Sequence, residues 1–239
     1  STERDFFIRK DREILPVAYI ATPLWDEGEV VGSVMAFQDI THRKEAEQKI
    51  QYLAHHDALT GLPNRNLMTE MLNHNLAIAR RYGGALALLF IDLDNFKQIN
   101  DVQGHKVGDQ LLVSVSRILQ SRLRSYDILA RWGGDEFVVV IPDLADTTVA
   151  RNIAEKLSAA VNDKLGLDRN FHITLSIGIA LYPDDAASTD SLLIQADKAL
   201  FHAKSQGRNN IQVFGDIHEQ GIGYLDTELT SRFTSVLKH

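Results

Sequence analysis

The sequence contains no cysteine. The chain therefore cannot form a disulfide, bind a metal through thiolates or use a cysteine nucleophile, and it is compatible with a reducing compartment. Long apolar runs are also missing, because a membrane helix needs roughly 20 such residues, and the N-terminus has no signal-peptide pattern. We therefore expect a soluble, cytoplasmic fragment without membrane contact of its own. A membrane attachment upstream in a full-length protein stays compatible with this expectation.

Positive charge is in short supply. The chain has 25 lysine and arginine residues against 32 aspartate and glutamate residues, a formal net charge of -7. A broad nucleic-acid-binding face needs a basic patch, so this balance excludes nucleic acid as the main partner. It leaves room for one small phosphorylated ligand held by a few local cations and Mg²⁺. A composition that is 44% hydrophobic and 24% charged suits one globular domain plus a smaller part.

Two apolar stretches near the N-terminus, residues 14–25 and 29–40, predict a pair of strands joined by a turn at residues 26–28. Two strands alone are only marginally stable in water, so we expect them to be a fragment of a larger sheet. The alternative is an unrelated hairpin that packs on the main domain.

A charged helix is predicted next, with Thr41 as its N-cap. Ala46, Ile50 and Leu53 follow a spacing of i, i+4 and i+7, which gives the narrow apolar stripe of a coiled-coil seam. We therefore expect residues 41–56 to pair with their copy and to transmit a signal. An ordinary solvent-facing linker helix is the alternative.

A glycine pair, Gly133-Gly134, lies between two apolar runs and predicts a hairpin with these glycines as its turn. Asp135 and Glu136 follow directly. Neighbouring residues of a strand point to opposite faces, so the two acids are expected to serve different partners, one a metal and the other a reacting group. Taken alone, the pattern is equally compatible with a polar hairpin tip.

A continuous apolar run at residues 85–91 is typical of a central strand covered on both faces. It is followed by Asp92 and Asp94, and residues 95–101 then predict a short helix. Carboxylates at a strand end that face a helix N-terminus form a nucleotide site, because the acid binds Mg²⁺ and the first N–H groups of the helix point at phosphate oxygens.

Several motifs follow one another along the chain: DALTGLPNR at 57–65, DLDNFKQINDVQGHKVGD at 92–109, RSYD at 124–127, GGDEF at 133–137, TLSIGIA at 174–180 and AKSQGRN at 203–209. Together they resemble the GGDEF diguanylate cyclases, and the likeness covers residues 57–214. The resemblance implies an α+β fold with a central, mostly antiparallel sheet of about five strands flanked by helices.

The resemblance also divides the chain. Residues 57–215 would form the cyclase domain, residues 41–56 the signalling helix and residues 216–239 a C-terminal tail. Gly32 and the DIT ending of the second N-terminal strand resemble the end of a PAS sensor domain. Residues 1–40 are therefore expected to be the C-terminal fragment of a PAS-like sensor.

For the chemistry, the resemblance makes Asp92 and Asp135 ligands of Mg²⁺, or alternatively Mn²⁺, with a further contact from the carbonyl of Leu93. Glu136 would assist the attacking 3′-hydroxyl, either as a general base or as a ligand of a second metal ion. These residues form the expected catalytic and metal-binding set.

The resemblance further implies contacts to GTP. Main-chain N–H groups of residues 95–97 would hold the phosphates, and the glycine pair would let the substrate approach without a Cβ in the way. Two side chains would recognise guanine, because a carboxylate matches its paired N–H donors, and two cations would contact the terminal phosphates. The expected substrate-binding residues are Asn95, Phe96, Lys97, Asn100, Asp109, Gly133, Gly134, Lys204 and Arg208.

Other charged residues have expected structural roles. Asp94 and Asp101 are predicted to be caps without a catalytic role, and His105 is predicted to support its loop. Lys204 and Arg208, four residues apart at a helix end, would converge on one anion, although a basic helix C-terminus also satisfies the helix dipole. Arg131 is expected to make a structural contact.

Arg124 and Asp127 precede Gly133 at the spacing of the family's inhibitory site, in which the arginine binds a guanine and a phosphate of the cyclic product. An exposed salt bridge is the alternative for this common pattern. Arg151 is a candidate for a second arginine at the same site.

The resemblance thus implies a diguanylate cyclase of bacterial signal transduction. Two GTP-loaded domains of a homodimer would form the second messenger cyclic di-GMP, which then inhibits the enzyme. The rival hypothesis is a non-catalytic cyclic di-GMP receptor that binds through Arg124 and Asp127. A phosphodiesterase partner would require an EAL-type domain after residue 239.

Overall fold

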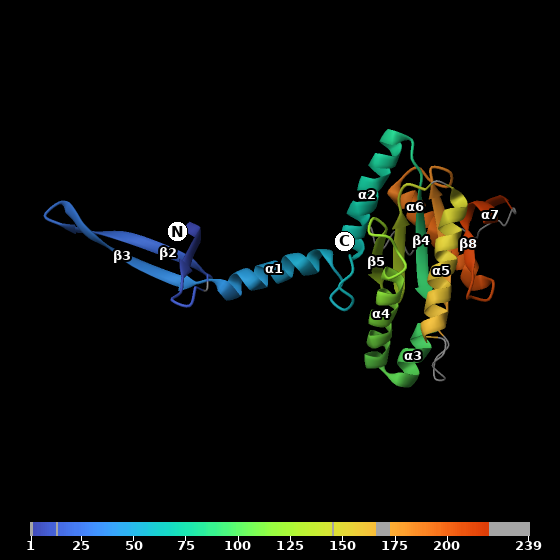
Figure 1. Cartoon of the computed structure of the whole chain (residues 1–239), viewed down its shortest axis with the longest axis horizontal. Coiled ribbons are helices and arrows are strands. Elements are labelled where there is room, and N and C mark those ends of the chain that lie inside the picture. The colour runs from blue at the N-terminus through green and yellow to red at the C-terminus, as the bar shows by residue number, and fades with distance from the viewer. Residues whose placement is uncertain (1, 13, 145, 166–172, 220–239) are drawn as a thin grey trace. The chain divides into compact units, whose positions relative to one another are not determined.

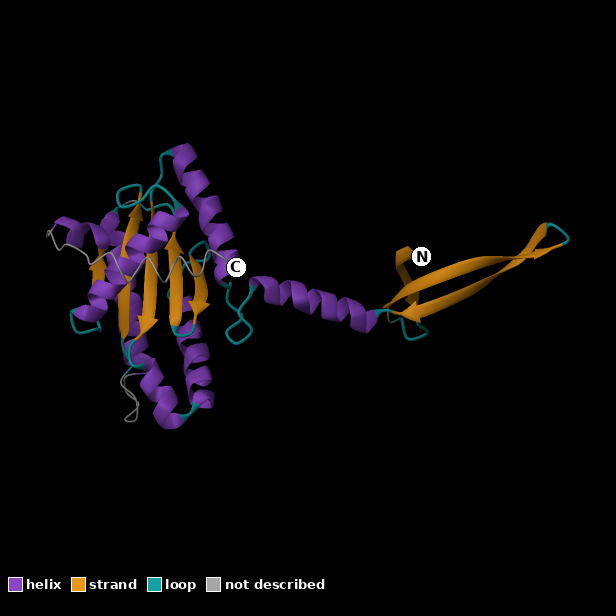
Figure 2. Ribbon diagram, turned by 180° about the vertical axis from the view of Figure 1, so that it is seen from behind, coloured by secondary structure: helices purple, strands orange, loops and turns teal. Residues whose placement is uncertain are grey.

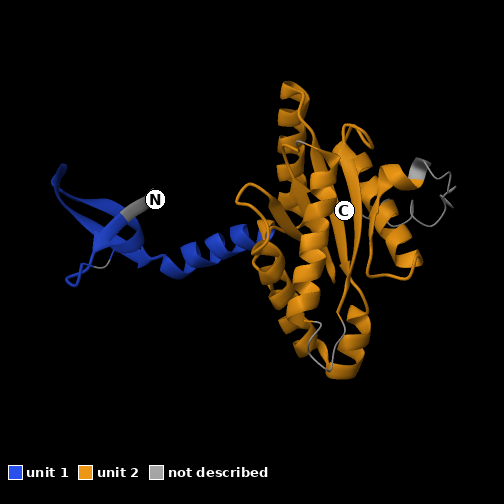
Figure 3. Cartoon of the chain, turned by 45° about the vertical axis from the view of Figure 1, so that its right-hand side comes forward, with its two compact units in different colours: residues 1–54 blue, residues 55–239 orange. Residues whose placement is uncertain are grey.

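The computed structural model describes residues 2–12, 14–144, 146–165 and 173–219. The chain divides into two compact units, residues 1–54 and residues 55–239, which Figure 3 colours separately. The predicted tail lies outside the described residues from position 220 onward.

Unit 1 is a three-stranded antiparallel sheet in the order β1-β2-β3 (Figure 1). Its strands are β1 (Thr2–Ile8), β2 (Ile14–Asp26) and β3 (Glu29–Asp39). The predicted strand pair is confirmed, and Glu27 and Gly28 turn between the strands with positive φ. The sequence did not predict β1, because TERDFFI mixes charged and apolar residues without regular alternation.

Little of the unit 1 sheet is buried. Val17 has no exposed surface, whereas Val34 and Met35, neighbours that point to opposite faces of β3, are 55% and 50% exposed. Both faces of this sheet therefore show large apolar side chains, as expected of a fragment of a larger sheet. The assignment to a PAS-like sensor stays a prediction.

Helix α1 (Thr41–His55) has no buried residue. Thr41 is its first helical residue and donates its backbone N–H to Asp39 Oδ1 at 2.9 Å, so the prediction of Thr41 as the N-cap is wrong by about one position. Ile50 and Leu53 of the predicted stripe are 68% and 40% exposed. The stripe exists, and its pairing with a second copy stays a prediction.

Unit 2 is built on a five-stranded sheet in the order β5-β6-β4-β7-β8, which confirms the predicted α+β architecture. Figure 2 shows the strands of this sheet in orange, with purple helices beside them. The strands are β4 (Leu86–Leu93), β5 (Ile128–Gly133), β6 (Glu136–Ile141), β7 (Leu175–Tyr182) and β8 (Ile211–Val213). All neighbours pair antiparallel except β7 and β8, which pair parallel. The strand predicted at 171–182 begins later, at Leu175, and residues 171 and 172 are not described.

Helices cover both faces of this sheet. They are α2 (Arg65–Tyr82), α3 (Phe96–Gln103), α4 (His105–Gln120), α5 (Thr147–Leu165), α6 (Thr189–Ser205) and α7 (Phe214–Glu219). Residues of α2 and α6 pack on one face, and residues of α3, α4 and α5 pack on the other. None of the helices in the described part of the chain is long and apolar enough to cross a membrane.

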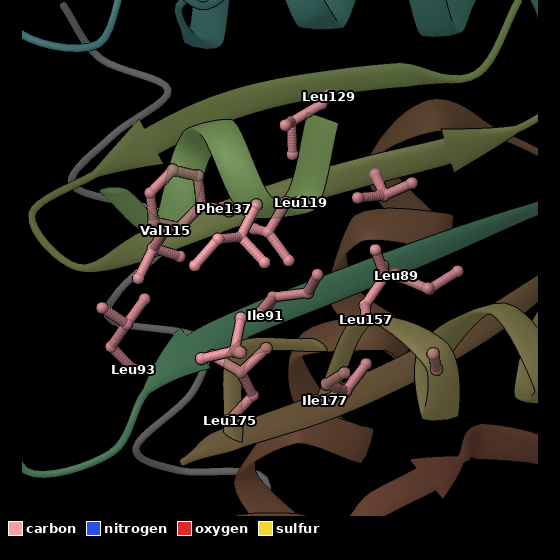
Figure 4. Packing of buried hydrophobic residues seen from close by; sticks show 14 of the residues in the cluster. Leu89, Ile91, Leu93, Val115, Leu119, Leu129, Phe137, Leu157, Leu175 and Ile177 are labelled. Atoms are coloured by element: carbon pink, nitrogen blue, oxygen red, sulfur yellow. The ribbon is translucent and has the colours of Figure 1, made fainter. Parts of the chain in front are cut away.

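Strand β4 is the centre of the core, and each of its residues is buried. Leu89, Ile91 and Leu93 point into the cluster of α3, α4 and α5, as Figure 4 shows, while Leu88 and Phe90 join the cluster of α2 and α6. Alternate side chains of one strand thus enter two cores. The run predicted to be a doubly covered strand is confirmed as one.

Candidate active site

The ends of β4 and β6 bring two of the predicted acids together. Asp92, near the end of β4, lies directly opposite Glu136, the first residue of β6. Residues that face each other in an antiparallel pair project to the same side of the sheet. That side is the one covered by α2 and α6, because Phe90 and Val138, two residues away on each strand, belong to its cluster. The metal-binding acid and the catalytic acid predicted from the sequence are therefore neighbours.

Asp135 lies in the hairpin turn, which differs from the prediction by one residue. Gly133 ends β5 and pairs with Glu136, so Gly134 and Asp135 are the turn residues, and Gly134 has a φ of 50°. A register shift between Arg131 and Gly133 moves the pairing. The expectation that Asp135 and Glu136 point to opposite faces of one strand is wrong, because Asp135 is not on the strand.

The turn nevertheless reaches the end of β4. The backbone N–H of Leu93 donates to the carbonyl oxygen of Asp135 at 3.3 Å, and the charge of Asp135 acts on Asp92. Within the described residues, no three His, Cys, Asp or Glu side chains form a metal site by themselves. Two carboxylates and a carbonyl are still a suitable set for Mg²⁺, which usually takes one or two carboxylates together with substrate phosphates.

Asp92 is buried, and its pKa is shifted from the ordinary value of an aspartate. Its pKa is raised from 3.8 to about 6. Burial is the main cause, the charges of Asp135 and Asp94 add to it, and Lys204 acts in the opposite direction. The ammonium group of Lys204 lies 2.5 Å from Asp92 Oδ2. The structure thus brings Lys204, predicted as a phosphate contact, to the predicted metal ligand.

Arg65 is a residue of this site that the sequence did not single out. It is the first residue of α2, and Asn64 caps that helix by accepting a hydrogen bond from the backbone N–H of Leu67 at 3.1 Å. The guanidinium of Arg65 lies 4.2 Å from the ring centroid of Trp132. Burial lowers the pKa of Arg65 while the charge of Glu136 raises it. The signal in the sequence that could have identified Arg65 is its position as a basic residue directly after the cap residue Asn64.

Arg131 connects the hairpin turn to the DALTGLPNR motif. Its Nη1 donates to both carboxylate oxygens of Asp57, at 3.0 and 3.1 Å, and its Nε and Nη2 donate to the carbonyl oxygen of Gly134, at 3.1 and 2.7 Å. Burial raises the pKa of Asp57, but hydrogen bonds from Thr60 and Arg131 outweigh it, so the net shift is downward. The structural contact predicted for Arg131 is present.

The start of α3 supplies the predicted phosphate-binding backbone. Asn95, rather than Asp94, holds the N-cap position and has a φ of 62° without a side-chain cap hydrogen bond, so the prediction of Asp94 as a cap is wrong. Phe96 is buried, whereas Asn95 and Lys97 are exposed. The first N–H groups of α3 therefore lie at a surface directly after β4, which carries the predicted metal ligand Asp92, as a phosphate site requires.

The two predicted guanine contacts come from neighbouring helices. Asn100 of α3 has a buried Oδ1 without a hydrogen-bond partner, and this oxygen would lie 1.9 Å from a Cβ placed on Gly108 of α4. An unpaired buried acceptor is unfavourable unless a ligand satisfies it. Asp109 is exposed one residue further on, and Asp101 and His105 are exposed as well. The recognition of guanine stays a prediction.

Arg208 does not share a helix with Lys204. Helix α6 ends at Ser205, so the argument from a spacing of four helical residues is wrong for this pair. Arg208 lies in the following loop, with a φ of 65° after Gly207 at 104°. The position of Arg208 is therefore set by this loop and not by helix α6, and its contact with phosphates stays a prediction.

The RxxD segment forms a compact turn. Asp127 Oδ2 accepts the backbone N–H of Arg124 at 2.8 Å, while Asp127 Oδ1 is buried without a partner. The exposed guanidinium of Arg124 donates to the hydroxyl of Tyr126 at 2.6 Å. Arg151 instead forms an ion pair with Asp216 of α7 at 2.6 Å. Because α7 follows β8, at the sheet edge opposite β5, the structure does not bring Arg151 to the RxxD segment.

The mostly antiparallel sheet, the acids at the ends of β4 and β6 and the helix N-terminus beside them describe an α+β domain with a candidate nucleotide site at the end of its central strand. The model of the family described as "Diguanylate cyclase, GGDEF domain" matches residues 54–210. The chain belongs to this family.

Curated relatives have the same domain within longer proteins. The bifunctional diguanylate cyclase/cyclic di-GMP phosphodiesterase MucR of Pseudomonas aeruginosa is 40% identical over 202 residues, which cover 84% of this chain and 29% of MucR. The diguanylate cyclase DgcM of Escherichia coli is 40% identical over 178 residues, or 72% of this chain and 42% of DgcM. The chain thus spans less than half the length of these relatives.

Solved structures confirm the fold of unit 2. The GGDEF domain of TpbB (YfiN) from Pseudomonas aeruginosa has a TM-score of 0.64 and 39% identity, covering 69% of this chain and 99% of that one. The coiled coil and GGDEF domain of DgcB from Caulobacter crescentus, solved in complex with c-di-GMP, has a TM-score of 0.65 and 28% identity, covering 73% and 93%.

Proposed function

We propose that this chain is a diguanylate cyclase that condenses two GTP molecules into cyclic di-GMP and releases two pyrophosphates. The observation that carries the proposal is the pairing of Asp92 with Glu136 across β4 and β6, with the Asp135 turn hydrogen-bonded to Leu93. Three acids thus meet where a strand ends and a helix N-terminus begins, as nucleotidyl transfer requires.

Asp92, Asp135 and the carbonyl of Leu93 would hold Mg²⁺, and these hard oxygen donors would also accept Mn²⁺. When bound, the ion neutralises charge on the phosphoryl oxygens and makes pyrophosphate a better leaving group. Lys204 forms an ion pair with Asp92. Its side chain would turn to the terminal phosphates when GTP binds, and Arg208 would contact the same phosphates.

Glu136 accepts the proton of the 3′-hydroxyl of one GTP. The oxygen then bonds to the α-phosphorus of the other GTP, while the bond from that phosphorus to the bridging oxygen of the β-phosphate breaks and pyrophosphate leaves. Arg65 is a cation whose charge interacts with Glu136. A second such step closes the ring.

Substrate binding uses the backbone before and within α3. The N–H groups of Asn95, Phe96 and Lys97 hold the phosphates, and Asn100 and Asp109 bind guanine. Adenine lacks the paired donors of guanine, so discrimination against ATP is expected at these two residues.

The reaction requires two domains. One unit 2 with one GTP has a single 3′-hydroxyl and a single α-phosphate at its site, so two copies must face each other to close the ring. The exposed stripe with Ile50 and Leu53 on α1 supports pairing just before the catalytic unit. The homodimer is therefore part of the proposal.

Product inhibition would occur at the RxxD turn. The exposed guanidinium of Arg124 suits a guanine and a phosphate, and the unpaired Oδ1 of Asp127 is a vacant acceptor for a ligand N–H. Arg124→Ala is expected to leave the initial rate unchanged and to weaken inhibition by cyclic di-GMP. Arg122→Ala, which removes an exposed arginine outside the motif, is the control. Equal inhibition in the two variants would contradict this site.

The decisive experiment is incubation with GTP and Mg²⁺, with pyrophosphate and cyclic di-GMP as readouts. Glu136→Gln is expected to lower turnover by about 10²–10⁴-fold, as for loss of a general base, while GTP binding is largely retained. Glu155→Gln, an exposed glutamate of α5, is the matched control. No turnover by the unmodified protein, together with tight binding of cyclic di-GMP, would favour the non-catalytic receptor.

A further inference from the structure

Asp94 is a buried carboxylate that the proposed mechanism does not use. It is 1% exposed. Its Oδ2 accepts hydrogen bonds from Thr174 Oγ1 at 2.7 Å and from the backbone N–H of Asn209 at 3.0 Å, and its Oδ1 accepts one from Ser176 Oγ at 2.7 Å. A buried carboxylate is stable only when donors of this kind surround it. Three neutral donors from distant parts of the chain thus converge on one acid.

These donors connect three segments of the proposed site. Asp94 follows the metal-binding end of β4 and precedes the N-terminus of α3, and its backbone N–H donates to the carbonyl oxygen of Thr174 at 3.0 Å, which extends the pairing of β4 with β7. Ser176 lies at the start of β7, Thr174 directly precedes that strand, and Asn209 belongs to the loop after α6. The carboxylate of Asp94 therefore connects the end of β4 with the start of β7 and with the loop that carries Arg208.

The loop after α6 needs such an external contact. Gly207, Arg208 and Asn209 have consecutive φ values of 104°, 65° and 47°. Residues with a side chain rarely adopt this region, and they remain there only when the surrounding structure holds them. The N–H of Arg208 donates to the carbonyl oxygen of Ala203 at 3.2 Å, and the N–H of Asn209 donates to Asp94. Asp94 thus holds the end of the strained turn that carries Arg208.

We propose that Asp94 is a positioning residue for nucleotide binding. Asp94 fixes Asn209, and Asn209 follows Arg208 directly. The contact therefore places the guanidinium of Arg208 at the terminal phosphates, at a set position relative to Asp92, which lies two residues before Asp94. The inference rests on the proposed GTP site. The two acids of this motif thus have different roles. Asp92 would bind the metal, whereas Asp94 would orient the cation Arg208, which binds the phosphates.

The test compares GTP with GMP, which lacks the terminal phosphates. Binding of each nucleotide is measured by calorimetry with Mg²⁺, in the Glu136→Gln protein so that turnover is suppressed. Asp94→Asn turns one acceptor into a donor that faces the Thr174 and Asn209 donors or the Ser176 hydroxyl. We expect it to weaken GTP binding about tenfold, the scale of one charge-assisted contact, and to leave GMP binding unchanged. Asp101→Asn, an exposed aspartate of α3, is the matched control.

A double variant shows whether Asp94 acts through Arg208. Arg208→Ala should weaken GTP binding by a similar factor, and adding Asp94→Asn should weaken it no further. If Asp94→Asn does not fold, Thr174→Val removes one of its three hydrogen bonds, and Thr174→Ser keeps the hydroxyl and should restore the selectivity for GTP over GMP.

The possible results separate this role from the proposed function. A parent protein that binds neither nucleotide would overturn the proposed function and this inference with it. A parent that binds GTP, with Asp94→Asn or Thr174→Val weakening GTP and GMP equally, would overturn the positioning role alone. Additive effects of Asp94→Asn and Arg208→Ala would do the same.

Discussion

The two sheets of this chain differ in what covers them. In unit 2, each residue of β4 and β7 is buried between layers of helices. In unit 1, most described side chains of β2 and β3 are exposed, and Val17 is a buried exception. Both sheets are rich in apolar residues, so composition does not distinguish them. It is the covered sheet that has a strand end at which Asp92 is buried beside Glu136 and Lys204. The proposed chemistry is therefore assigned to unit 2.

The largest expected effect comes from filling the contact between β7 and α6. A Cβ on Gly178 would lie 2.1 Å from the carbonyl oxygen of Ala196 and 2.2 Å from the backbone nitrogen of Leu200. Backbone atoms cannot move aside as a side chain can, so Gly178→Val is expected to lower the free energy of unfolding of unit 2 by about 5 kcal/mol or more. Urea denaturation followed by circular dichroism measures the change.

Gly32 of β3 gives the matched control in the open sheet. A Cβ there meets Leu24 Cδ1 at 3.7 Å, an ordinary van der Waals contact. Gly32→Val should leave the unfolding of unit 2 within about 0.5 kcal/mol of the unmodified protein. Similar losses in the two variants would contradict the difference between covered and open sheets.

A large loss is also expected from the core side chain Phe137. It has no exposed surface and lies in the cluster of α3, α4 and α5, as Figure 4 shows. Phe137→Ala leaves a cavity that the surrounding layers cannot close, and we expect it to destabilise unit 2 by about 3–5 kcal/mol. The midpoint of chemical unfolding measures it. A loss below about 1 kcal/mol, as for an exposed residue, would contradict the packing of this layer.

The next effect is the pH dependence of stability that comes from Asp92, the acid buried at the end of β4. The pKa of Asp92 is raised from 3.8 to about 6, chiefly by burial. The folded protein therefore binds this proton more tightly than the unfolded chain does, so the contribution is most favourable below pH 3.8 and is lost as the pH rises through about 6. Without Mg²⁺, we expect about 3 kcal/mol of stability to be lost from this group between about pH 4 and 7.

Asp92→Asn isolates that contribution from the other acids. The difference in unfolding free energy between the unmodified protein and Asp92→Asn should change with pH across this window, in favour of the unmodified protein at low pH. Lys204→Met, which removes the cation 2.5 Å from Asp92, should move the transition to higher pH. Parallel pH profiles for the unmodified protein and Asp92→Asn would show that the burial of this acid does not perturb it.

Local sequence patterns predicted the covered sheet well. The apolar run before Asp92, the turn signals around Gly134 and the glycine at 178 each have a local physical cause, and each gave the correct element. The misplaced turn shows the limit, because a register shift at Gly133 depends on pairing between two strands. The motif spacing likewise predicted which acids would meet, but not their side-chain partners.

Long-range contacts account for what the sequence could not show in the site. Asp94 meets Thr174 and Asn209, which are 80 and 115 residues away, and no local pattern encodes these distances. The link from Arg131 to Asp57 spans 74 residues in the same way. Arg65 was missed because its neighbour Trp132 is reached only through the fold.

The smallest expected effect tests the open sheet itself. Phe37 of β3 is 61% exposed, and its described ring contact is an edge-to-face pair with Phe7, with centroids 5.1 Å apart. Phe37→Ala removes this pair and little buried area, so we expect a loss of at most about 1 kcal/mol, against the several expected for Phe137→Ala. Thermal unfolding of both variants under one condition makes the comparison. A loss for Phe37→Ala as large as that for Phe137→Ala would mean that this face of β3 is covered in the folded protein, and the contrast between the sheets would then disappear.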